Sequence, residues 1–570
     1  MKEKKPGGQR KAWAGSAQVA VCGVALCFAA LHGECAQRVA APAAGPAAAA
    51  AGYRIAGVVV DAAAGTPVAG AELSISVASQ EVKVTADGEG KFVFEGMEPG
   101  TYAVNAEAPG YVREAYNQHG AFSTAIIVGS GLDSEHLVFR LHRQAVILGN
   151  VTDERGEAVR RAQVMLFEEQ RGTGKRGIRM LSQVQTDDLG AYRFAHLLAG
   201  KYFVAVSARP WYAQAGLTNQ GEVLSSSGTR MYARGPKTDA KLDVVYATTF
   251  YPGVTDEHSA GELVVRAGET QEADVRLQAV PAIHVRLTNM PADQPNGPAV
   301  GVAANQKIFD SYSAGLGVIS GPIAPGVYEV GGLPPGDVTL TLNENRNGEW
   351  ENRTIRANLS EGESVDAGRT GATANVSGRV IPAEGSGAAM QGDVVLTGKE
   401  HQTVSRKVEK DGTFSFVGVE ADTYEVAVNL GVDEEYVERM AATGAKASGR
   451  EVKIEGAGDV QLVMRMGRGL GQVKGVVNVD GKAEAGVMVV LVPESRENVE
   501  RETRMDQSDS DGTFTLRGIL PGKYVLLAIE DGWDLEWAEA GVMEPYWKKG
   551  QRIEIGAKEV KKVLVEGQKR

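Results

Sequence analysis

A short sequence unit recurs along this chain of 570 residues and restricts what the chain can fold into. Residues 509–533 read "DSDGTFTLRGILPGKYVLLAIEDGW", which predicts a turn, a strand, a second turn and a second strand. Related stretches begin at Asp87, Asp187 and Asp411, and a more divergent copy covers residues 325–342. The residue that starts the first strand precedes the residue that anchors the second by ten positions, in the pairs Phe92 and Tyr102, Tyr192 and Tyr202, Tyr328 and Val338, Phe414 and Tyr424, and Phe514 and Tyr524. A repeat at this scale predicts an array of similar small domains.

The residue types within each copy favour tight turns between short strands. Asp-Gly pairs predict reversals with a positive φ angle at the glycine, at positions 87–88, 411–412 and 511–512. Pro-Gly pairs at 99–100, 335–336 and 521–522 predict type II turns. Between these turns, alternating patterns such as "FVF" and "YRF" predict strands that bury one face.

Upstream of each hairpin, a unit opens with a strand that begins at glycine, and a second apolar strand follows. The opening glycines are Gly57, Gly149, Gly378 and Gly475. About seven short strands in roughly 90–135 residues, with little helical periodicity, indicate an antiparallel β-sandwich. We therefore expect an all-β chain of about five seven-stranded antiparallel sandwiches in tandem, joined by short linkers into an elongated particle.

The repeat spacing also predicts the domain boundaries. The expected order is a signal peptide, an Ala/Pro-rich linker, a first sandwich, a second with a long insertion, a degenerate third, a fourth and a fifth, over residues 1–36, 37–52, 53–143, 144–279, 280–369, 370–467 and 468–570.

The N-terminal segment has the layout of an export signal. Basic residues from Lys2 to Lys11 precede the apolar stretch "AGSAQVAVCGVALCFAALHG". This order is typical of a secretory signal peptide, and an uncleaved N-terminal anchor is the alternative. All three cysteines, Cys22, Cys27 and Cys35, lie in this segment, so cleavage after Ala36 would leave a mature chain without cysteine. We expect no membrane span after cleavage, and a periplasmic, cell-surface or secreted location.

The combined motif order resembles a known domain family. The order is G-x-V-x-D, then G-A-x-V, then D-x-x-G-x-F, then L-P-G-x-Y-x-V-x-A and finally G-Y. It resembles the carboxypeptidase regulatory-like domain, a transthyretin-like (prealbumin-like) sandwich grouped with carbohydrate-binding-like folds, and it is similar to Cna B-type surface repeats. The resemblance implies the fold more strongly than any single function, because one sandwich carries many unrelated roles.

The residue inventory argues against catalysis. None of the eight histidines has a glutamate three residues later, so the His-x-x-Glu zinc motif of a metallocarboxypeptidase is missing. His258 and Glu262 stand four residues apart with no second histidine nearby, which favours a solvated loop. We predict no catalytic residue, no metal site and no cofactor. The acidic stretch at residues 506–512 hints at a calcium loop but is already explained as a hairpin turn.

The charge balance also limits the partners. The formal net charge is −12 and no long basic run lies outside the N-terminus, so we expect no nucleic-acid partner.

The last unit holds the one candidate binding surface. Its segment "GWDLEWAEAGVMEPYWKKG" contains three of the six tryptophans. Trp533 has counterparts at Tyr111 and Trp211, so we expect these three rings to pack onto their own sandwiches. Residues without counterparts could instead form an aromatic and acidic platform for a sugar, and packing of a long loop is the alternative. These candidates are Trp537, Trp547, Tyr546, Asp534 and Glu536.

Together these features predict a non-catalytic, exported, multi-domain binding and spacer protein of the cell envelope, with polysaccharide as the leading ligand. The alternatives are a structural or adhesive surface protein that binds another envelope protein, and an accessory module to a hydrolase acting in trans. The long insertion at residues 209–256, with "RPWYAQ" and "TTFYPG", is a further candidate for function, because long loops on rigid scaffolds often carry it.

Overall fold

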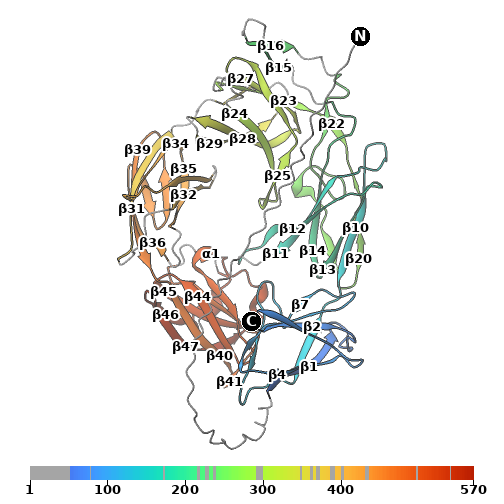
Figure 1. Cartoon of the computed structure of the whole chain (residues 1–570), viewed down its shortest axis with the longest axis vertical. Coiled ribbons are helices and arrows are strands. Elements are labelled where there is room, and N and C mark those ends of the chain that lie inside the picture. The colour runs from blue at the N-terminus through green and yellow to red at the C-terminus, as the bar shows by residue number, and fades with distance from the viewer. Residues whose placement is uncertain are drawn as a thin grey trace, which may run out of the picture. The chain divides into compact units, whose positions relative to one another are not determined.

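The structure is a computed structural model of the whole chain, in which residues 52–570 form one compact unit (Figure 1). It describes this unit except for residues 78, 171–173, 215–218, 225–229, 235–238, 291–299, 347–348, 360–363, 368–372, 385–391, 400–402, 431–434, 496–498 and 540. The predicted signal peptide and linker lie outside the described residues.

Five clusters of buried hydrophobic side chains follow one another along the described chain, and each fills the space between β-sheets. The predicted all-β tandem array of sandwiches is confirmed. The boundaries at single-residue precision stay a prediction.

The first and second sandwiches contain most of the short strands. The first has the sheet order β4-β1-β9 and β3-β2-β6-β7, with a β5-β8 pair. Its strands are β1 (Tyr53–Asp61), β2 (Glu72–Val77), β3 (Gln80–Thr85), β4 (Lys91–Met97), β5 (Gly100–Tyr102), β6 (Val104–Glu107), β7 (Glu114–Ala115), β8 (Ile126–Val128) and β9 (Leu137–Leu141).

The second sandwich has one sheet of order β13-β10-β20, in which β21 also pairs with β10, and another of order β12-β11-β14-β18, in which β19 also pairs with β14. Its strands and single 3-10 turn are β10 (Ala145–Thr152), β11 (Gln163–Gln170), β12 (Gly177–Gln185), β13 (Ala191–Leu197), β14 (Gly200–Ser207), β15 (Asn219–Leu224), β16 (Arg230–Arg234), β17 (Val244–Tyr246), β18 (Thr249–Phe250), η1 (Glu257–Ser259), β19 (Leu263–Val265), β20 (Thr270–Glu272), β21 (Val275–Arg276) and β22 (Ala279–Pro281).

The third sandwich, expected to be degenerate, has two four-stranded sheets, β26-β27-β23-β30 and β25-β24-β28-β29. Its strands are β23 (Ile283–Thr288), β24 (Val300–Ile308), β25 (Tyr312–Leu316), β26 (Ile319–Ala324), β27 (Val327–Leu333), β28 (Gly336–Arg346), β29 (Glu349–Leu359) and β30 (Ser364–Asp366). The described strands close a buried core, so the degenerate sequence still forms a two-layered sandwich.

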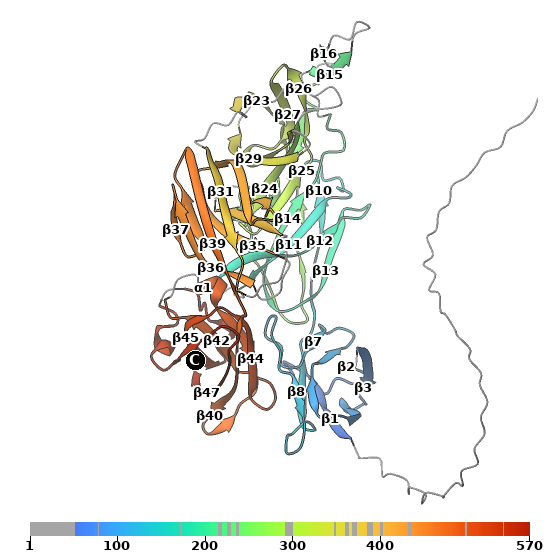
Figure 2. The same ribbon diagram turned by 60° about the vertical axis from the view of Figure 1, so that its left-hand side comes forward.

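The fourth and fifth sandwiches follow the same plan (Figure 2). The fourth has β34-β31-β39-β36 and β33-β32-β35-β38-β37, with strands β31 (Thr373–Ile381), β32 (Asp393–Gly398), β33 (Thr403–Lys407), β34 (Thr413–Glu420), β35 (Asp422–Asn429), β36 (Glu435–Thr443), β37 (Lys446–Ser448), β38 (Glu451–Ile454) and β39 (Gly458–Arg468). The fifth has the order β41-β40-β47-β45-β42-β43, with β44 on β40 and β46 on β45. Its elements are β40 (Gly471–Val479), β41 (Lys482–Ala483), β42 (Met488–Pro493), α1 (Val499–Glu502), β43 (Arg504–Gln507), β44 (Thr513–Ile519), β45 (Gly522–Glu530), η2 (Gly532–Asp534), α2 (Glu544–Trp547), β46 (Gln551–Ile555) and β47 (Val560–Lys569).

Each sandwich contains parallel strand pairing that the alternating pattern did not predict, and the fifth has an additional parallel pair between β45 and β47. The opening strand of every unit lies parallel to the closing strand of the same unit, as in β1 with β9 and β31 with β39. The same arrangement joins β10 to β20 and β21, β23 to β30, and β40 to β47.

The opening glycines permit this close parallel approach. A Cβ atom built on Gly378 would lie 2.1 Å from the carbonyl oxygen of Leu462 on β39 and 2.5 Å from the ring of Phe414 on β34. Gly57, Gly149 and Gly475 face a closing-strand carbonyl oxygen in the same way, at 2.1, 2.4 and 2.7 Å. These distances are far shorter than van der Waals contact, so only glycine fits beside the closing-segment carbonyl at these four positions.

The anchor tyrosines stabilise the hairpins as the repeat predicted. Each is partly or fully buried, and its hydroxyl donates to the backbone carbonyl four residues earlier, at 2.8–3.1 Å, in Tyr102, Tyr202, Tyr424 and Tyr524. A buried hydroxyl with a partner avoids the cost of an unmade hydrogen bond.

Two of the turn predictions are wrong in detail. In the first unit the positive φ angle falls at Gly90 rather than Gly88, because Asp87 and Gly90 close the turn with a backbone hydrogen bond. Gly100 and Gly522 of the Pro-Gly pairs do not adopt positive φ. The positive φ falls four residues earlier instead, at Gly96 and Gly518, where the strand register shifts at a β-bulge.

Hydrogen bonds also join sandwiches that are not neighbours along the chain. The fifth sandwich forms hydrogen bonds with the first, and its Ala538 amide donates to the carbonyl of Gly174 in the second. Contacts between distant repeats require complementary surfaces, which repeat spacing does not reveal.

We expect Gly378→Ala to destabilise the fourth sandwich by about 1–3 kcal/mol, because the added methyl group overlaps the Leu462 carbonyl. Hydrogen exchange of the β31 and β39 amides measures this locally. Gly301→Ala on β24 is the matched control, because its Cβ would come no closer than 3.9 Å to another atom. Equal exchange rates in both variants would contradict the packing role of the opening glycine.

Candidate functional site

The loop between β45 and β46 of the fifth sandwich holds the residues that the sequence singled out. It contains η2 and α2, and its apolar side chains pack on the outer faces of β42 and β45 in a second cluster beside the main core. β42 and β45 are buried on both faces, because this loop covers the side that faces away from the core. The loop therefore packs on the sandwich and covers the outer faces of β42 and β45 with its apolar side chains.

The two tryptophans without counterparts come together there. Trp537 is 7% exposed and belongs to the buried cluster, and Trp547 is half-buried against it. Both line one cavity of about 140 Å³, together with Glu539 and Glu544. Tyr546 packs on the same cluster from α2.

The second sandwich covers part of this loop. The hairpin formed by β11 and β12 brings Gly174 against the ring of Trp537. A Cβ on Gly174 would lie 2.4 Å from that ring. Arg176 of the same hairpin forms an ion pair with Glu536 at 3.4 Å. The ring of Trp537 is therefore packed between two sandwiches.

Of the acidic candidates, Asp534 and Glu536 are engaged with basic side chains. Asp534 pairs with Arg570 at 3.2 Å, and both side chains are well exposed. The structure thus brings Trp537, Trp547 and Tyr546 together, whereas it directs Asp534 and Glu536 to separate ion pairs. A sugar-binding role for these five residues stays a prediction.

The three counterpart aromatics have three different environments. The hydroxyl of Tyr111 donates to Asp61 of its own sandwich at 3.0 Å, as expected. Trp533 donates from Nε1 to the Gly486 carbonyl of its own sandwich at 3.3 Å, and its ring also stacks on His119 of the first sandwich. Trp211 is 76% exposed, so the expectation that it packs on its sandwich is wrong. It meets only the edge-on ring of Tyr212 among the aromatic contacts of the described residues.

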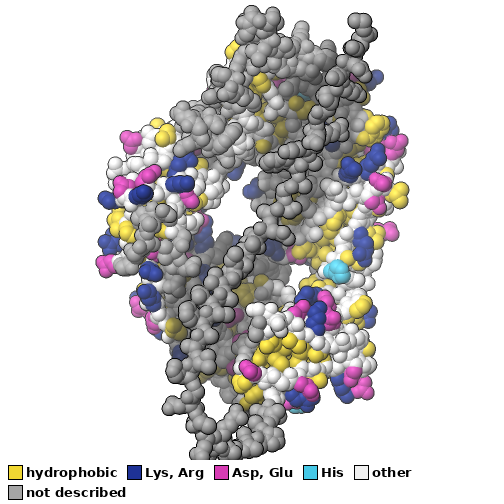
Figure 3. Space-filling view, viewed as in Figure 1, with side chains coloured by type: hydrophobic (Ala, Val, Ile, Leu, Met, Phe, Trp, Pro, Cys, Tyr) yellow, Lys and Arg dark blue, Asp and Glu magenta, His cyan; other side chains and the backbone are white. Residues whose placement is uncertain are grey.

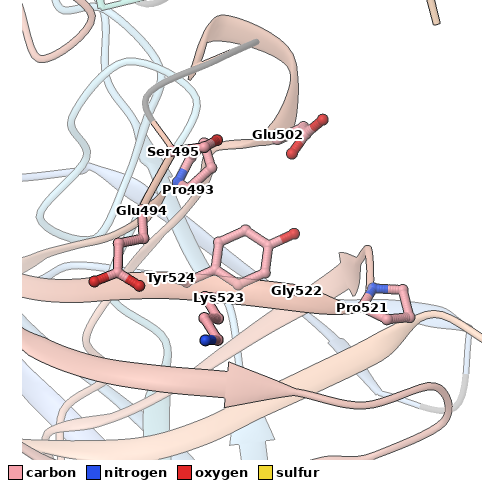
Figure 4. A pocket seen from close by; sticks show the side chains of 8 residues that line it. All are labelled: Pro493, Glu494, Ser495, Glu502, Pro521, Gly522, Lys523 and Tyr524. Atoms are coloured by element: carbon pink, nitrogen blue, oxygen red, sulfur yellow. The ribbon is translucent and has the colours of Figure 1, made fainter. Parts of the chain in front are cut away.

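A larger pocket of about 390 Å³ lies at the β44–β45 turn of the fifth sandwich (Figure 4). The ring of Tyr524 lies along it, with Glu494 toward one end and Pro521 toward the other. Glu494 pairs with Arg552 at 3.2 Å, and burial raises the pKa of Tyr524 to about 12. Tyr524 therefore stays protonated at neutral pH, and its hydroxyl donates to the Leu520 carbonyl at 2.8 Å.

An acidic pair encloses a histidine at the junction of the second and third sandwiches. His284 of β23 contacts Glu329 through Nδ1 and Asp243 through Nε2, both at 2.8 Å. Glu329 is buried, and its hydrogen bond to His284, with the charge of Asp243, raises the pKa of His284 to about 9. The histidine is thus a cation that joins two sandwiches. No local sequence motif predicts this histidine bridge, because Asp243 lies 41 residues from His284.

The acidic stretch that hinted at calcium forms a turn. Within the described ranges no group of three His, Cys, Asp or Glu side chains could hold a metal ion. Asp509 accepts a hydrogen bond from the Ala125 amide, and Asp511 caps Thr513 of its own turn.

On the face shown in Figure 3, Lys and Arg side chains stand beside Asp and Glu rather than gathering in one area. In the described part of the chain, no helix is long and apolar enough to cross a membrane.

Comparison with known families finds matches in three places, two of which support the predicted resemblance. Residues 54–131 and 146–223 match the model of the carboxypeptidase regulatory-like domain, which confirms the predicted resemblance for the first two sandwiches. Residues 470–545 match the model of the second β-sandwich domain of NOMO1-like subunits of the BOS complex. No curated protein sequence matches the chain.

Among solved structures, the similarities are distant. They include a streptococcal ancillary pilin (12% identity, TM-score 0.20, covering 50% of this chain and 99% of that one), the major pilin RrgB of Streptococcus pneumoniae (8%, 0.16, 90% and 99%) and the fimbrial anchor protein Mfa2 of Porphyromonas gingivalis (13%, 0.14, 38% and 82%). Similarity at these TM-scores carries no argument about function.

We expect Trp537→Ala to destabilise the fifth sandwich by about 3–5 kcal/mol, the usual cost of removing a buried large aromatic side chain. Trp211→Ala should change stability by less than about 0.5 kcal/mol, because its ring is exposed. Hydrogen exchange of β42, β45 and the second sandwich measures both changes. A stable Trp537→Ala variant would show that this ring is not part of the core.

We expect the contacts of His284 with Asp243 and Glu329 to make the junction between the second and third sandwiches less stable at alkaline pH. The pKa of His284 is raised in the folded state, so its contribution to stability is fully present below about pH 6.5, the ordinary value for histidine. That contribution is lost as the pH rises through about 9. Amide protection of β17 and β23, corrected for intrinsic exchange, should therefore fall between pH 7 and pH 10.

His284→Gln should remove this pH dependence, because glutamine does not titrate. His258→Gln is the control, since His258 is exposed and pairs only locally with Asp256. An unchanged profile in His284→Gln would show that another group causes the alkaline loss.

Proposed function

We propose that this chain is a non-catalytic, exported spacer and binding protein of the cell envelope. The observation that carries the proposal is the packed junction between the second and third sandwiches. There the ring of Phe309, from the turn after β24, packs among Phe167, Phe203 and Phe250 of the second sandwich, with centroid distances of 5.1–5.3 Å. These contacts belong to one buried cluster that both sandwiches share.

Polar contacts support the same junction. The amide of Phe309 donates to Glu257 at 2.7 Å, Thr248 donates to Gln306 at 2.7 Å, and His284 bridges Asp243 and Glu329. An apolar cluster with directed hydrogen bonds holds two domains in one orientation, whereas relative motion is the default for small polar interfaces. Fixed orientation suits a protein that holds a ligand or a partner at a set distance.

Export rests on the sequence of the first 36 residues, with its basic and then apolar order. The mature chain would carry no cysteine and so would need no disulfide for folding outside the cytoplasm. The sandwiches are instead stabilised by their own buried cores.

Carbohydrate is the ligand class we propose for the fifth sandwich. The cavity lined by Trp537 and Trp547 combines the half-buried indole ring of Trp547 with the carboxylates of Glu539 and Glu544, while Trp537 forms its buried wall. Indole faces pack on the C–H groups of a sugar ring, and carboxylates accept hydrogen bonds from its hydroxyl groups. The exposed ring of Trp211 on the second sandwich is a separate surface of the same chemistry.

A protein partner is the second candidate, and β34 favours it. This strand lies at the edge of its sheet, and Val417 on it is 62% exposed. An exposed edge strand with apolar side chains can pair with a strand of another protein.

The test is binding of residues 37–570 to envelope polysaccharides by isothermal titration. Replacing both cavity carboxylates, Glu539→Gln with Glu544→Gln, should weaken binding about tenfold, or roughly 1.4 kcal/mol, without changing the thermal melt, because both side chains are exposed. Trp211→Ala should leave the affinity unchanged.

If only Trp211→Ala loses binding, the polysaccharide site lies on the second sandwich instead of the fifth. If no polysaccharide binds and an envelope protein does, the carbohydrate assignment fails and the edge strand β34 becomes the site to test. Peptide hydrolysis by the purified chain with added zinc would overturn the non-catalytic assignment.

A further inference from the structure

We propose that the fifth sandwich carries a docking site for the first sandwich of the same chain, built at the turn between β43 and β44. The ligand of this site is the segment of the first sandwich between β7 and β8, residues 116–125.

Backbone and side-chain hydrogen bonds join the two surfaces over more than 380 positions of sequence. The Ser510 amide donates to the Ala125 carbonyl at 2.9 Å, and the Ala125 amide donates to Asp509 at 3.0 Å. The Ile127 amide donates to the Ser510 hydroxyl at 2.8 Å. Short, reciprocal bonds of this kind fix a register, as in the addition of a strand to a sheet.

Gln507 is the centre of the site. Its Nε2 donates to the Asn117 carbonyl at 2.6 Å and to the Thr124 hydroxyl at 2.8 Å, and its Oε1 lies 3.1 Å from Nδ1 of His119. Thr124 in turn donates to the Ser508 carbonyl at 3.3 Å. The Gln507 side chain is buried with both ends of its amide engaged, as a specific buried polar contact requires.

The equivalent turns of this chain use their carboxylates differently, and in the fourth sandwich Asp411 caps Thr413 in the way that Asp511 caps Thr513 in the fifth. In the first and second sandwiches, Asp87 and Asp187 cap their own turns by accepting two backbone amides each. Asp509 occupies the same position, because its backbone closes the turn through Thr513 and Gly512 in the same pattern. Its carboxylate bonds to the first sandwich instead, and Asp511 takes over the capping of Thr513.

The exposure of the side chain two residues before this turn also differs between the fifth sandwich and the others. The residues equivalent to Gln507, two before the turn, are Thr85, Gln185 and Lys407, and all three are exposed. Only the fifth unit, among the described copies, buries this position. The turn is thus a repeated structural element that one unit uses for binding.

An aromatic contact completes the surface. The rings of His119 and Trp533 stack with an interplanar angle of 5° and centroids 4.9 Å apart, and Phe122 approaches the same indole at 5.6 Å. Gly486 makes room for the approaching segment, because a Cβ there would lie 2.3 Å from Nδ2 of Asn117. Stacked rings in such contacts contribute beyond their buried area.

The occupant is the first sandwich of the same chain rather than that of a second copy. The intervening sandwiches tether the two surfaces, so docking within one chain benefits from an effective concentration in the millimolar range. Docking makes the first and last sandwiches neighbours, and it covers Trp533 and the acidic turn at residues 507–510.

Double electron–electron resonance on residues 37–570, which contain no native cysteine, tests the proposal. Spin labels at Arg140→Cys and Lys482→Cys, both at exposed positions, report the separation of the two sandwiches. The unaltered interface should give one narrow distance distribution. Gln507→Ala with Asp509→Ala should shift the docking equilibrium about tenfold or more toward longer distances, because several hydrogen bonds are lost.

Two further variants separate docking from folding. Thr124→Val, on the ligand side, keeps the shape of the side chain and should broaden the distribution in the same direction. Gln185→Ala with Asp187→Ala alters the equivalent turn of the second sandwich and should leave the distance unchanged. Unchanged distributions in both interface variants, or a dimeric mass by light scattering that the Gln507 and Asp509 variant abolishes, would overturn docking within one chain.

Discussion

The parallel pairing of each unit's first and last strands is the constraint on which this protein depends. It closes every sandwich on itself, so that each core is complete before the next begins. Glycine stands on the opening strand of four units, because a carbonyl oxygen of the closing segment occupies the place of a Cβ, and at Gly378 and Gly475 a core aromatic ring does so too. The third unit has Leu287 at this position, opposite Tyr328, and its closing strand β30 is three residues long. A unit can therefore lose the glycine and still close, with a shorter parallel pair.

Self-contained units leave their turns and loops free for contacts with other units. Phe309 enters an aromatic cluster of the second sandwich, His284 bridges acids from two sandwiches, and Gln507 reaches the first sandwich. Each contact comes from a turn or a strand end, where residues can change without disturbing the core. Functional diversity among similar sandwiches can arise in this way, since the scaffold is shared and the surface is not.

The candidate site shows how far residue types can predict an environment. The sequence correctly grouped Trp537, Trp547 and Tyr546, because they lie close together in one loop. It did not predict that Gly174 of a distant hairpin covers Trp537, nor that Trp211 stays exposed while Trp533 meets His119. Equivalent repeat positions thus share a backbone but not a neighbour, and a side chain's burial depends on that neighbour.

By itself, the sequence determined the all-β class, the repeat of sandwiches, the hairpins and the inward tyrosines. These follow from local alternation, turn residues and a fixed spacing of ten residues, which are properties of neighbouring positions. Only the tertiary structure decided which strands pair in parallel, why the opening glycines are required, and which turns contact other sandwiches. Asp87 and Asp509 illustrate the division, because both start the same turn, yet one carboxylate caps its own backbone and the other binds a sandwich more than 380 residues away. The physical reason is that a hydrogen bond or a packed ring needs a partner at contact distance, and folding alone determines which distant residue comes that close.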